Sequence, residues 1–422
     1  MEIEELERRA LEALDVSEVT RLCSELVRVP SENPPGDVSE AAAIASNWLS
    51  ERGHELAIYE PGKGRVNVVS STGDGEPHLL FLGHLDVVPA GDRERWSFDP
   101  FCGEIRDGKV LGRGATDMKG GVACAMVVYS VLSDLVEELG GKLTLALTCD
   151  EETGGRLGAG WLVEKRLLDA DACIVLEPTT PYAVILGERG ICWLKLRAYG
   201  RPAHGSVPRL GLNAIMLMAR ALEKLMELDG ERGEIPEEAR EVLVDMERAI
   251  EVLRTLGVGE GVQEEIVRAC SRVTVNVGVI RGGTKVNVVP DYCEAEVDVR
   301  IPYGVSPDSI IERARRLISE LGGKVEVEAL SRVEPSFTSP RAPVCRALEE
   351  AAEDLLGCSL MRFLMPATTD ARYLRARGVP TVVYGPGAVE LAHSYDEHVS
   401  IEHLEHVSKV LCAASVRFLG KR

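Results

Sequence analysis

Residues 79–89 read LLFLGHLDVVP, and the interpretation of the chain starts from this stretch. Residues 79–83 form an apolar run of the kind expected for a short strand buried on both faces. His84 ends this strand and Asp86 follows two residues later, so in an extended backbone both side chains point the same way. A carboxylate beside an imidazole can accept the proton of one ring nitrogen and leave the other nitrogen free for a metal. The alternative is a surface loop that carries a histidine and an aspartate by chance.

The length and the charge of the chain limit the kind of protein it can be. At 422 residues it is too long for a single hydrophobic core, so we expect two domains. A content of 45% hydrophobic and 27% charged residues is typical of soluble globular proteins. The net charge of -20 argues against a nucleic acid or an anionic membrane surface as the partner.

The cysteines and the N-terminus bear on the cellular location. The 11 cysteines are scattered and form no C-x-x-C pair, a pattern of a reducing compartment rather than of a disulfide framework. The N-terminal residues MEIEE are acidic, with no apolar signal region. No apolar run approaches the roughly 18 residues of a membrane span. We therefore expect a cytoplasmic protein.

Strands and helices alternate along the first part of the chain. This order requires a mostly parallel sheet flanked by helices, which is an α/β fold. The same pattern resumes near the C-terminus. The predicted helices are a pair within 1–28, then 38–52, 122–139, 343–356 and 401–418, and the predicted strands are 66–69, 79–83, 143–148, 172–176 and 379–384.

The pattern changes near residue 188. Strands there alternate polar and apolar residues, which indicates an antiparallel sheet in an α+β domain inserted into the first one. The insert contains predicted strands 191–199, 273–280, 286–289, 293–301 and 324–329, helices 213–228 and 309–321, and a charged helical hairpin at 230–268. The predicted domains are a catalytic domain in two parts, 1–187 and 334–422, and an inserted dimerisation or lid domain, 188–333.

A glycine-rich loop, GRGATDMKGG at residues 112–121, precedes the predicted helix 122–139. Such a loop could hold a phosphate at the helix N-terminus. Its spacing fits neither the Walker nor the dinucleotide fingerprint. We favour the interpretation that the glycines let the backbone bend tightly around an inward-pointing Asp117.

Acidic and imidazole groups follow several predicted strands. His84, Glu152 and Glu177 come at strand ends, and Asp117 comes shortly after its strand. In an open α/β sheet the carboxyl edge is where sites are built. The alternative for the run Asp150-Glu151-Glu152 is a solvated acidic loop.

A second histidine, His393, lies six residues beyond the YGPG segment that ends the last predicted strand. Two imidazoles and several carboxylates suit a pair of divalent metals such as zinc, with one carboxylate shared between them. A further carboxylate that binds no metal can move the proton of the attacking water.

In this order the motifs resemble those of the co-catalytic zinc amidohydrolases, a family with acetylornithine deacetylase, succinyl-diaminopimelate desuccinylase, aminoacylase and glutamate carboxypeptidase members. The resemblance covers nearly the whole chain. It is carried by GHLDVVP, GRGATDMKGG, TCDEETGG, LEPT, GRPAHGS, GGTKVNVVPD and the YGPG segment with His393. It implies a zinc-peptidase-like fold.

The resemblance implies a role for each site residue. One zinc would be held by His84 and Glu177 and the other by Glu152 and His393, with Asp117 shared by both. Glu151 would be the general base and acid, and Asp86 would orient His84. A cis peptide is implied at Asp117-Met118. The implied cofactors are two zinc ions, for which cobalt can substitute.

Further residues are implied outside the metal centre, most of them in the inserted domain. His204 corresponds to the family histidine that reaches a neighbouring subunit's site and stabilises the oxyanion, and its alternative is a turn histidine. Arg300, Asn287 and Thr368 resemble residues that hold the substrate carboxylate. Arg300 could equally pair with Asp298 on its strand.

The expected protein is a homodimeric, metal-dependent hydrolase that cleaves the amide bond of N-acyl amino acids, of the acetylornithine deacetylase or succinyl-diaminopimelate desuccinylase type. The same-class alternative is a carboxypeptidase or dipeptidase that acts on a peptide bond. The alternative from another class is a metal-binding or scaffold protein that has lost activity. The presence of Glu151 argues against it, because a binding protein needs no base beside its ligands.

Overall fold

The computed structural model describes residues 2–255 and 262–420, and it divides into two compact units. The first unit consists of Met1–Leu186, Thr338–Phe363 and Thr369–Arg422, and the second of Gly187–Phe337 and Leu364–Thr368. We had predicted domain boundaries after residues 187 and 333. The first boundary of the structure lies one residue before the predicted one, and the second lies four residues after it. The second unit also contains the short segment 364–368.

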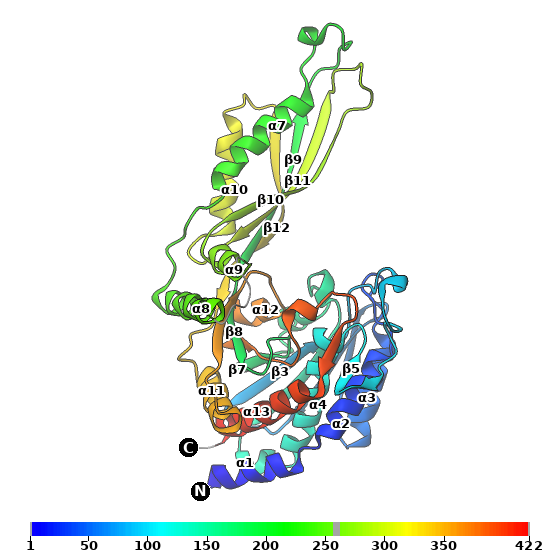
Figure 1. Cartoon of the computed structure of the whole chain (residues 1–422), viewed down its shortest axis with the longest axis vertical. Helices are drawn as coiled ribbons and strands as arrows, with labels where there is room; N and C mark the ends of the chain where they lie inside the picture. Colours follow the sequence, from blue (N-terminus) through cyan, green and yellow to red (C-terminus); the bar gives the residue numbers. More distant parts are fainter. Residues whose placement is uncertain (1, 256–261, 421–422) are drawn as a thin grey trace. The chain divides into compact units, whose positions relative to one another are not determined.

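The first unit is built on a mixed sheet whose centre is parallel (Figure 1). Its strands run in the spatial order β1-β2-β6-β3-β7-β15-β8. β3 lies between β6 and β7 and is parallel to both, and β15 is parallel to β7. The strand bounds are β1 Ala57–Gly62, β2 Arg65–Thr72, β3 His78–His84, β6 Lys142–Thr148, β7 Ala172–Val175, β8 Ala183–Glu188 and β15 Thr381–Val383. The central strands β3, β6 and β7 are buried almost throughout, as the apolar runs predict.

Helices flank this sheet. α4 packs on β3 and β6, α13 packs on β3 and α4, and α12 packs on β7 and β15. The bounds are α1 Glu2–Ala13, α2 Val16–Val27, α3 Ser39–Glu51, α4 Gly120–Ser133, α5 Val136–Leu139, α6 Ala159–Glu164, α11 Pro343–Leu356, α12 Ala371–Arg375 and α13 Ile401–Leu419. The predicted α/β fold with flanking helices is confirmed, although β1, α6 and β8 were not predicted.

A small antiparallel sheet of the first unit has the order β16-β5-β4, with β4 Ile105–Arg106, β5 Lys109–Leu111 and β16 His398–Ser400. Asp117 follows β5 in the π-helical turn η2, Ala115–Lys119, which leads into α4. Our prediction that Asp117 follows a strand of the main sheet is therefore wrong. Gly114 in this loop has φ +85, and a Cβ there would come within 2.5 Å of Val87, so glycine lets the loop bend closely around this point.

The second unit has an antiparallel sheet of order β10-β11-β9-β12, packed against α7 and α10. Its elements are β9 Gly190–Tyr199, α7 Ala214–Leu225, β10 Thr274–Gly282, β11 Tyr292–Ile301, α10 Pro307–Ser319 and β12 Val325–Val333. The inward residues of these strands and helices form one apolar core. The predicted inserted antiparallel sheet is thus confirmed.

Two predictions for the second unit need comment. Residues 286–289 are not a strand but a loop, exposed except for the buried Val289, because among the described residues they pair with a neighbour only through one bridge, Val288 to His204. The predicted helical hairpin contains α8 Glu237–Thr255 and α9 Val262–Ser271, which pack on each other, while its residues 256–261 lie outside the described part. The chain passes between the units at β8 and at the short strands β13 Ser336–Phe337 and β14 Met361–Met365.

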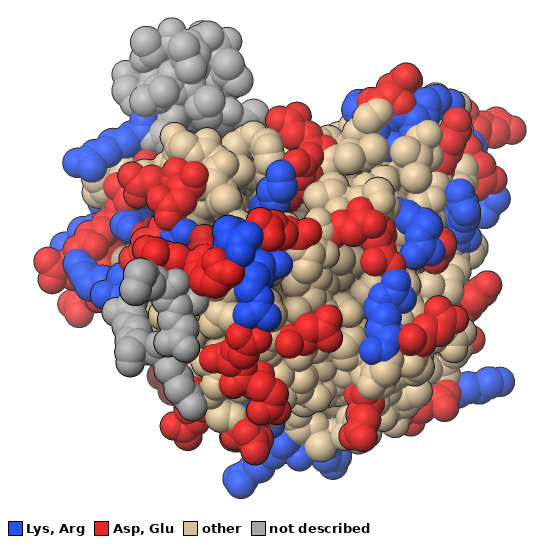
Figure 2. All heavy atoms as spheres, turned by 90° about the horizontal axis from the view of Figure 1, so that it is seen from below, with Lys and Arg blue, Asp and Glu red and all other residues tan. Residues whose placement is uncertain are grey.

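The surface has the mixed charge expected from the composition. Acidic and basic side chains are intermingled on the face drawn in Figure 2. Exposed ion pairs such as Arg9 with Glu138 also occur on the surface of the protein. None of the helices in the described residues has the length and apolar character that crossing a membrane requires.

Candidate metal centre

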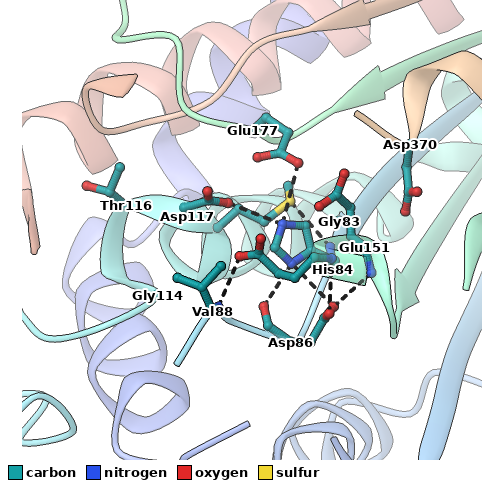
Figure 3. Close-up of polar contacts among 12 residues, drawn as sticks. Gly83, His84, Asp86, Val88, Gly114, Thr116, Asp117, Glu151, Glu177 and Asp370 are labelled. Atoms are coloured by element: carbon teal, nitrogen blue, oxygen red, sulfur yellow. Dashed lines mark hydrogen bonds and ion pairs between the residues drawn. The ribbon is translucent and has the colours of Figure 1, made fainter. Parts of the chain in front are cut away.

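The carboxyl ends of three neighbouring parallel strands meet at one edge of the main sheet. His84 is the last residue of β3, Glu151 and Glu152 lie in the turn after β6, and Glu177 comes two residues after β7. Because β6 and β7 flank β3 in register, the side chains of Glu151 and Glu177 converge on the His84 imidazole (Figure 3), and Glu152 also has a donor atom within 4.8 Å of a ring nitrogen of His84. The prediction that the strand ends bring these groups together is confirmed.

Asp117 lies between two histidines from distant parts of the sequence. Its Oδ1 is 3.2 Å from Nε2 of His84, and its Oδ2 is 3.2 Å from Nε2 of His393. Each oxygen of one carboxylate therefore faces a different imidazole, as a group shared by two metal ions must. The peptide bond Asp117-Met118 is cis, as expected.

Each imidazole has one further carboxylate beside it. Glu177 Oε1 is 3.4 Å from His84 Nε2, and Glu152 Oε2 is 3.2 Å from His393 Nε2. The donor atoms thus form two groups that share Asp117. Ligands of one tetrahedral ion with bonds of about 2.0–2.1 Å lie about 3.3 Å apart, so these spacings fit a pair of metal ions.

Glu151 also lies near these donors. One oxygen of Glu151, one of Glu177 and a ring nitrogen of His84 lie within 4.8 Å of one another. Geometry alone therefore allows Glu151 to be either a ligand or a base next to the ligands.

The pKa values of the site residues show that its carboxylates favour nearby positive charge. Burial opposes the charge on His84, yet Glu177 and Asp117 raise its pKa well above the ordinary value. Hydrogen bonds to Asp117 and Glu152 raise the pKa of His393 to about 10. Burial, with the charge of Asp117, raises the pKa of Glu177 to about 8. Protons thus balance the carboxylates when no cation is bound, and divalent metals would displace them.

Asp86 contacts both the ring of His84 and the turn that contains Glu151 and Glu152. The His84 Nδ1 atom contacts the main-chain carbonyl of Asp86 at 2.9 Å, while the Asp86 carboxylate is 3.5 Å away. That carboxylate accepts the backbone N–H group of Glu151 at 3.1 Å (Figure 3). It also accepts the backbone N–H of Glu152 at 3.2 Å and the side-chain amide of Asn33 at 2.8 Å. Asp86 thus contacts the His84 ring most closely through its backbone oxygen, and its orienting role stays a prediction.

Replacing Asp86 with asparagine should weaken metal binding and lower kcat/KM about 10–100-fold, the usual effect of losing an outer-shell partner. The new amide group would bring a donor against the donors of Glu152 and Asn33. Chelator competition and steady-state kinetics measure the effect. Asp171→Asn is the matched control, because the Asp171 carboxylate accepts the His78 backbone N–H at the start of β3, at the other end of this strand from His84. Equal effects of the two variants would contradict this assignment.

Three residues near the site were not predicted. Asn33 and Asp370 are buried beside Asp86 and Glu151, and Glu397 is buried behind Asp117. Burial, together with the charge of Asp86, raises the pKa of Asp370 to about 7. The sequence signals available were Asn33 within SENPPGD and Asp370 within ATTDAR, but neither spacing indicates a partner. Glu397 had no signal in the sequence.

The remaining predicted site residues belong to the second unit. His204 is exposed and its Nδ1 contacts Ser206 Oγ at 2.7 Å, while Asn287 is exposed in the adjoining loop and its carbonyl accepts the N–H of Gly205. Arg300 on β11 pairs with the Asp298 carboxylate through Nε at 3.0 Å, which is the alternative that the sequence left open. Thr368 ends the segment 364–368.

Comparisons with known proteins agree with this geometry. Residues 80–417 match the description of peptidase family M20/M25/M40. The chain is 29% identical to an acetylornithine deacetylase of Vibrio parahaemolyticus over 398 residues, which is 92% of this chain and 95% of the relative. It is 29% identical to a succinyl-diaminopimelate desuccinylase of Rhodospirillum centenum over 402 residues, 92% and 94% of the two chains. Its fold is similar to that of an M20 family metallo-carboxypeptidase of Sulfolobus solfataricus, with a TM-score of 0.78, 22% identity, and 95% and 99% of the chains covered.

Proposed function

The chain belongs to peptidase family M20/M25/M40, and from this premise we propose that it is a metal-dependent hydrolase that cleaves the amide bond of N-acyl amino acids. The names of its curated relatives, acetylornithine deacetylase and succinyl-diaminopimelate desuccinylase, support this substrate class. The observation that carries the proposal is the Glu151 carboxylate within 4.8 Å of donors on His84 and Glu177, beside the carboxylate of Asp117 that faces both imidazoles.

The proposed ligands follow from these contacts. His84 and Glu177 would hold one ion, Glu152 and His393 the other, and Asp117 would bind both. Nitrogen and oxygen donors of this kind suit zinc, and cobalt can replace it. Two such ions, when bound, polarise a carbonyl group and lower the pKa of water.

Glu151 is the proposed proton carrier. It takes a proton from the water whose oxygen joins the carbonyl carbon of the substrate. It then gives this proton to the amide nitrogen as the C–N bond breaks, so that a carboxylic acid and an amine leave. Asp86 supports this step, since its carboxylate fixes the backbone of Glu151.

The second unit would contribute to substrate binding. We propose that His204 stabilises the oxyanion and that Arg300, Asn287 and Thr368 hold the substrate carboxylate. Arg300 can do so only by sharing or leaving its ion pair with Asp298. A homodimer and a cytoplasmic location are part of the same proposal.

The alternative is a peptidase of the same family. It is favoured by the similarity of the fold to a metallo-carboxypeptidase. Both reactions break an amide next to an amino acid, and the same donor set and base serve both. The two functions therefore differ in the substrate pocket and not in the metal centre.

A substrate panel tests the proposal. Chelator-treated protein, reloaded with zinc or cobalt, is assayed on N-acetylornithine, N-succinyl-diaminopimelate, other N-acyl amino acids and simple dipeptides. We expect metal-dependent release of amine from one or more N-acyl amino acids. Cleavage of dipeptides alone would move the assignment to the peptidase alternative, and a protein that binds no metal would overturn the proposal.

A further inference from the structure

Glu397 is a fully buried carboxylate for which the mechanism above has no use. It lies four residues after His393 and behind the loop that contains Asp117. Its Oε1 accepts three backbone N–H groups of that loop, from Gly114 at 3.0 Å, Thr116 at 3.0 Å and Asp117 at 3.1 Å. Its Oε2 accepts a hydrogen bond from the buried guanidinium of Arg113.

The backbone on either side of Glu397 is tied to the same loop. The carbonyl of Glu397 accepts the N–H of Gly112 at 2.9 Å, and Thr116 Oγ1 donates to the carbonyl of His398 at 2.6 Å. β16 then continues these contacts by pairing with β5. Two segments about 280 residues apart, one with Asp117 and one with His393, are thus joined at Glu397.

The Glu397 carboxylate satisfies backbone N–H groups of the irregular loop that contains Asp117. A carboxylate oxygen satisfies three converging N–H groups with strong, charge-assisted hydrogen bonds, and a buried carboxylate in turn needs such donors or a paired cation. The loop from Gly114 to Asp117 is not regular helix, since Asp117 and Met118 have non-helical dihedral angles. A single carboxylate therefore holds in place a backbone that has few helical hydrogen bonds of its own.

We propose that Glu397 is a positioning residue of the metal centre, which sets the Asp117 carboxylate between His84 and His393 by binding the loop behind it. This inference rests on the proposed function, because it assumes that Asp117 is shared by two metals. It assigns Glu397 no contact with substrate. Its effect passes through the backbone N–H of Asp117, the residue that faces both imidazoles.

The test compares Glu397→Gln and Glu397→Asp with a matched control. Glutamine keeps the size but loses the charge, and aspartate keeps the charge but is too short to reach all three N–H groups. Glu7→Gln is the control, because Glu7 makes a two-point ion pair with Arg417, a remote residue of α13. It removes an arginine partner of the same kind without touching the Asp117 loop.

The measurements are zinc affinity by chelator competition, the visible absorption of the cobalt-loaded protein, and circular dichroism to check folding. In both Glu397 variants we expect the more weakly bound of the two metal ions to bind about 10–100-fold less tightly. We also expect the absorption spectrum of the cobalt-loaded variants to differ from that of the unmodified protein. The Glu7→Gln variant should keep the affinity and the spectrum of the unmodified protein. If one Glu397 variant does not fold, the other decides.

The outcomes separate this inference from the proposed function. Unchanged metal affinity and an unchanged cobalt spectrum in a folded Glu397 variant would overturn the positioning role, whatever the substrate proves to be. An equal loss of affinity in Glu7→Gln would also overturn it, because it would reveal a general effect of lost stability. A parent protein that binds no metal would instead refute the proposed function.

Discussion

Replacing Glu151 with glutamine is expected to lower kcat by a factor of about 10²–10⁴ while both metals stay bound. Glutamine has nearly the same size and can keep the backbone hydrogen bond from Glu151 to Asp86, but it can neither accept nor return a proton at neutral pH. Binding of substrate should change little, because the proton transfer occurs only in the reacting complex. The expected signature is a large fall in kcat at nearly constant KM.

The metal content of this variant is as informative as its rate. The Glu151 carboxylate lies within 4.8 Å of donors on His84 and Glu177, so geometry also allows it to be a ligand. If Glu151 were a ligand, the Glu151→Gln variant would lose bound metal to the same extent as it loses activity. Metal analysis after dialysis therefore distinguishes a base from a ligand. Glu164→Gln, at an exposed position on α6, serves as the control for the same change of charge.

An active Glu151→Gln variant with both metals would refute the assigned role. If the variant were inactive and had lost a metal, the assignment of the metal centre would stand, but Glu151 would be one of its ligands. Only inactivity with two metals retained fits the proton carrier that we propose.

The sequence could predict those site residues whose position is set by the end of the strand that precedes them. β3 is an apolar run that ends at His84, β6 ends four residues before Glu152, and β7 ends two residues before Glu177. Since parallel neighbours place their carboxyl ends at one edge, these three side chains had to converge. His393 could be counted among the candidate ligands from the sequence, but its assignment to one metal together with Glu152 came only from the family resemblance, because His393 lies ten residues after the end of β15.

The sequence could not predict contacts that depend on irregular backbone. Asp86 was expected to face the ring of His84, but its carboxylate binds the turn of Glu151 and Glu152, whose geometry depends on Asp150 at φ +73. Glu397 was missed because its partners lie about 280 residues away. Residues 286–289 are rich in valine and were predicted as a strand, yet Val286 is fully exposed, since strand pairing depends on a neighbour and not on residue type alone.

Replacing Asp117 with asparagine should have the largest effect on metal binding of any single change in this site. Both oxygens of Asp117 are engaged, each at 3.2 Å from a different imidazole. Asparagine offers one oxygen and one NH₂ group, and the NH₂ group cannot bind a metal ion. The loss should exceed the ~10–100-fold decrease that removal of an outer-shell partner causes. We therefore expect the content to fall below two metals per chain and the activity to fall with it.

Metal analysis, chelator competition and the amide-hydrolysis assay measure this variant, with circular dichroism to confirm that it folds. Asp107→Asn is the matched control, because Asp107 has φ +50 in the exposed turn between β4 and β5, where asparagine is readily accommodated. The control should retain two metals and full activity. If Asp117→Asn also retained both metals at the original affinity, the carboxylate would not be shared between them. The two histidines would then belong to separate sites, and the proton carrier at Glu151 would act beside one metal only.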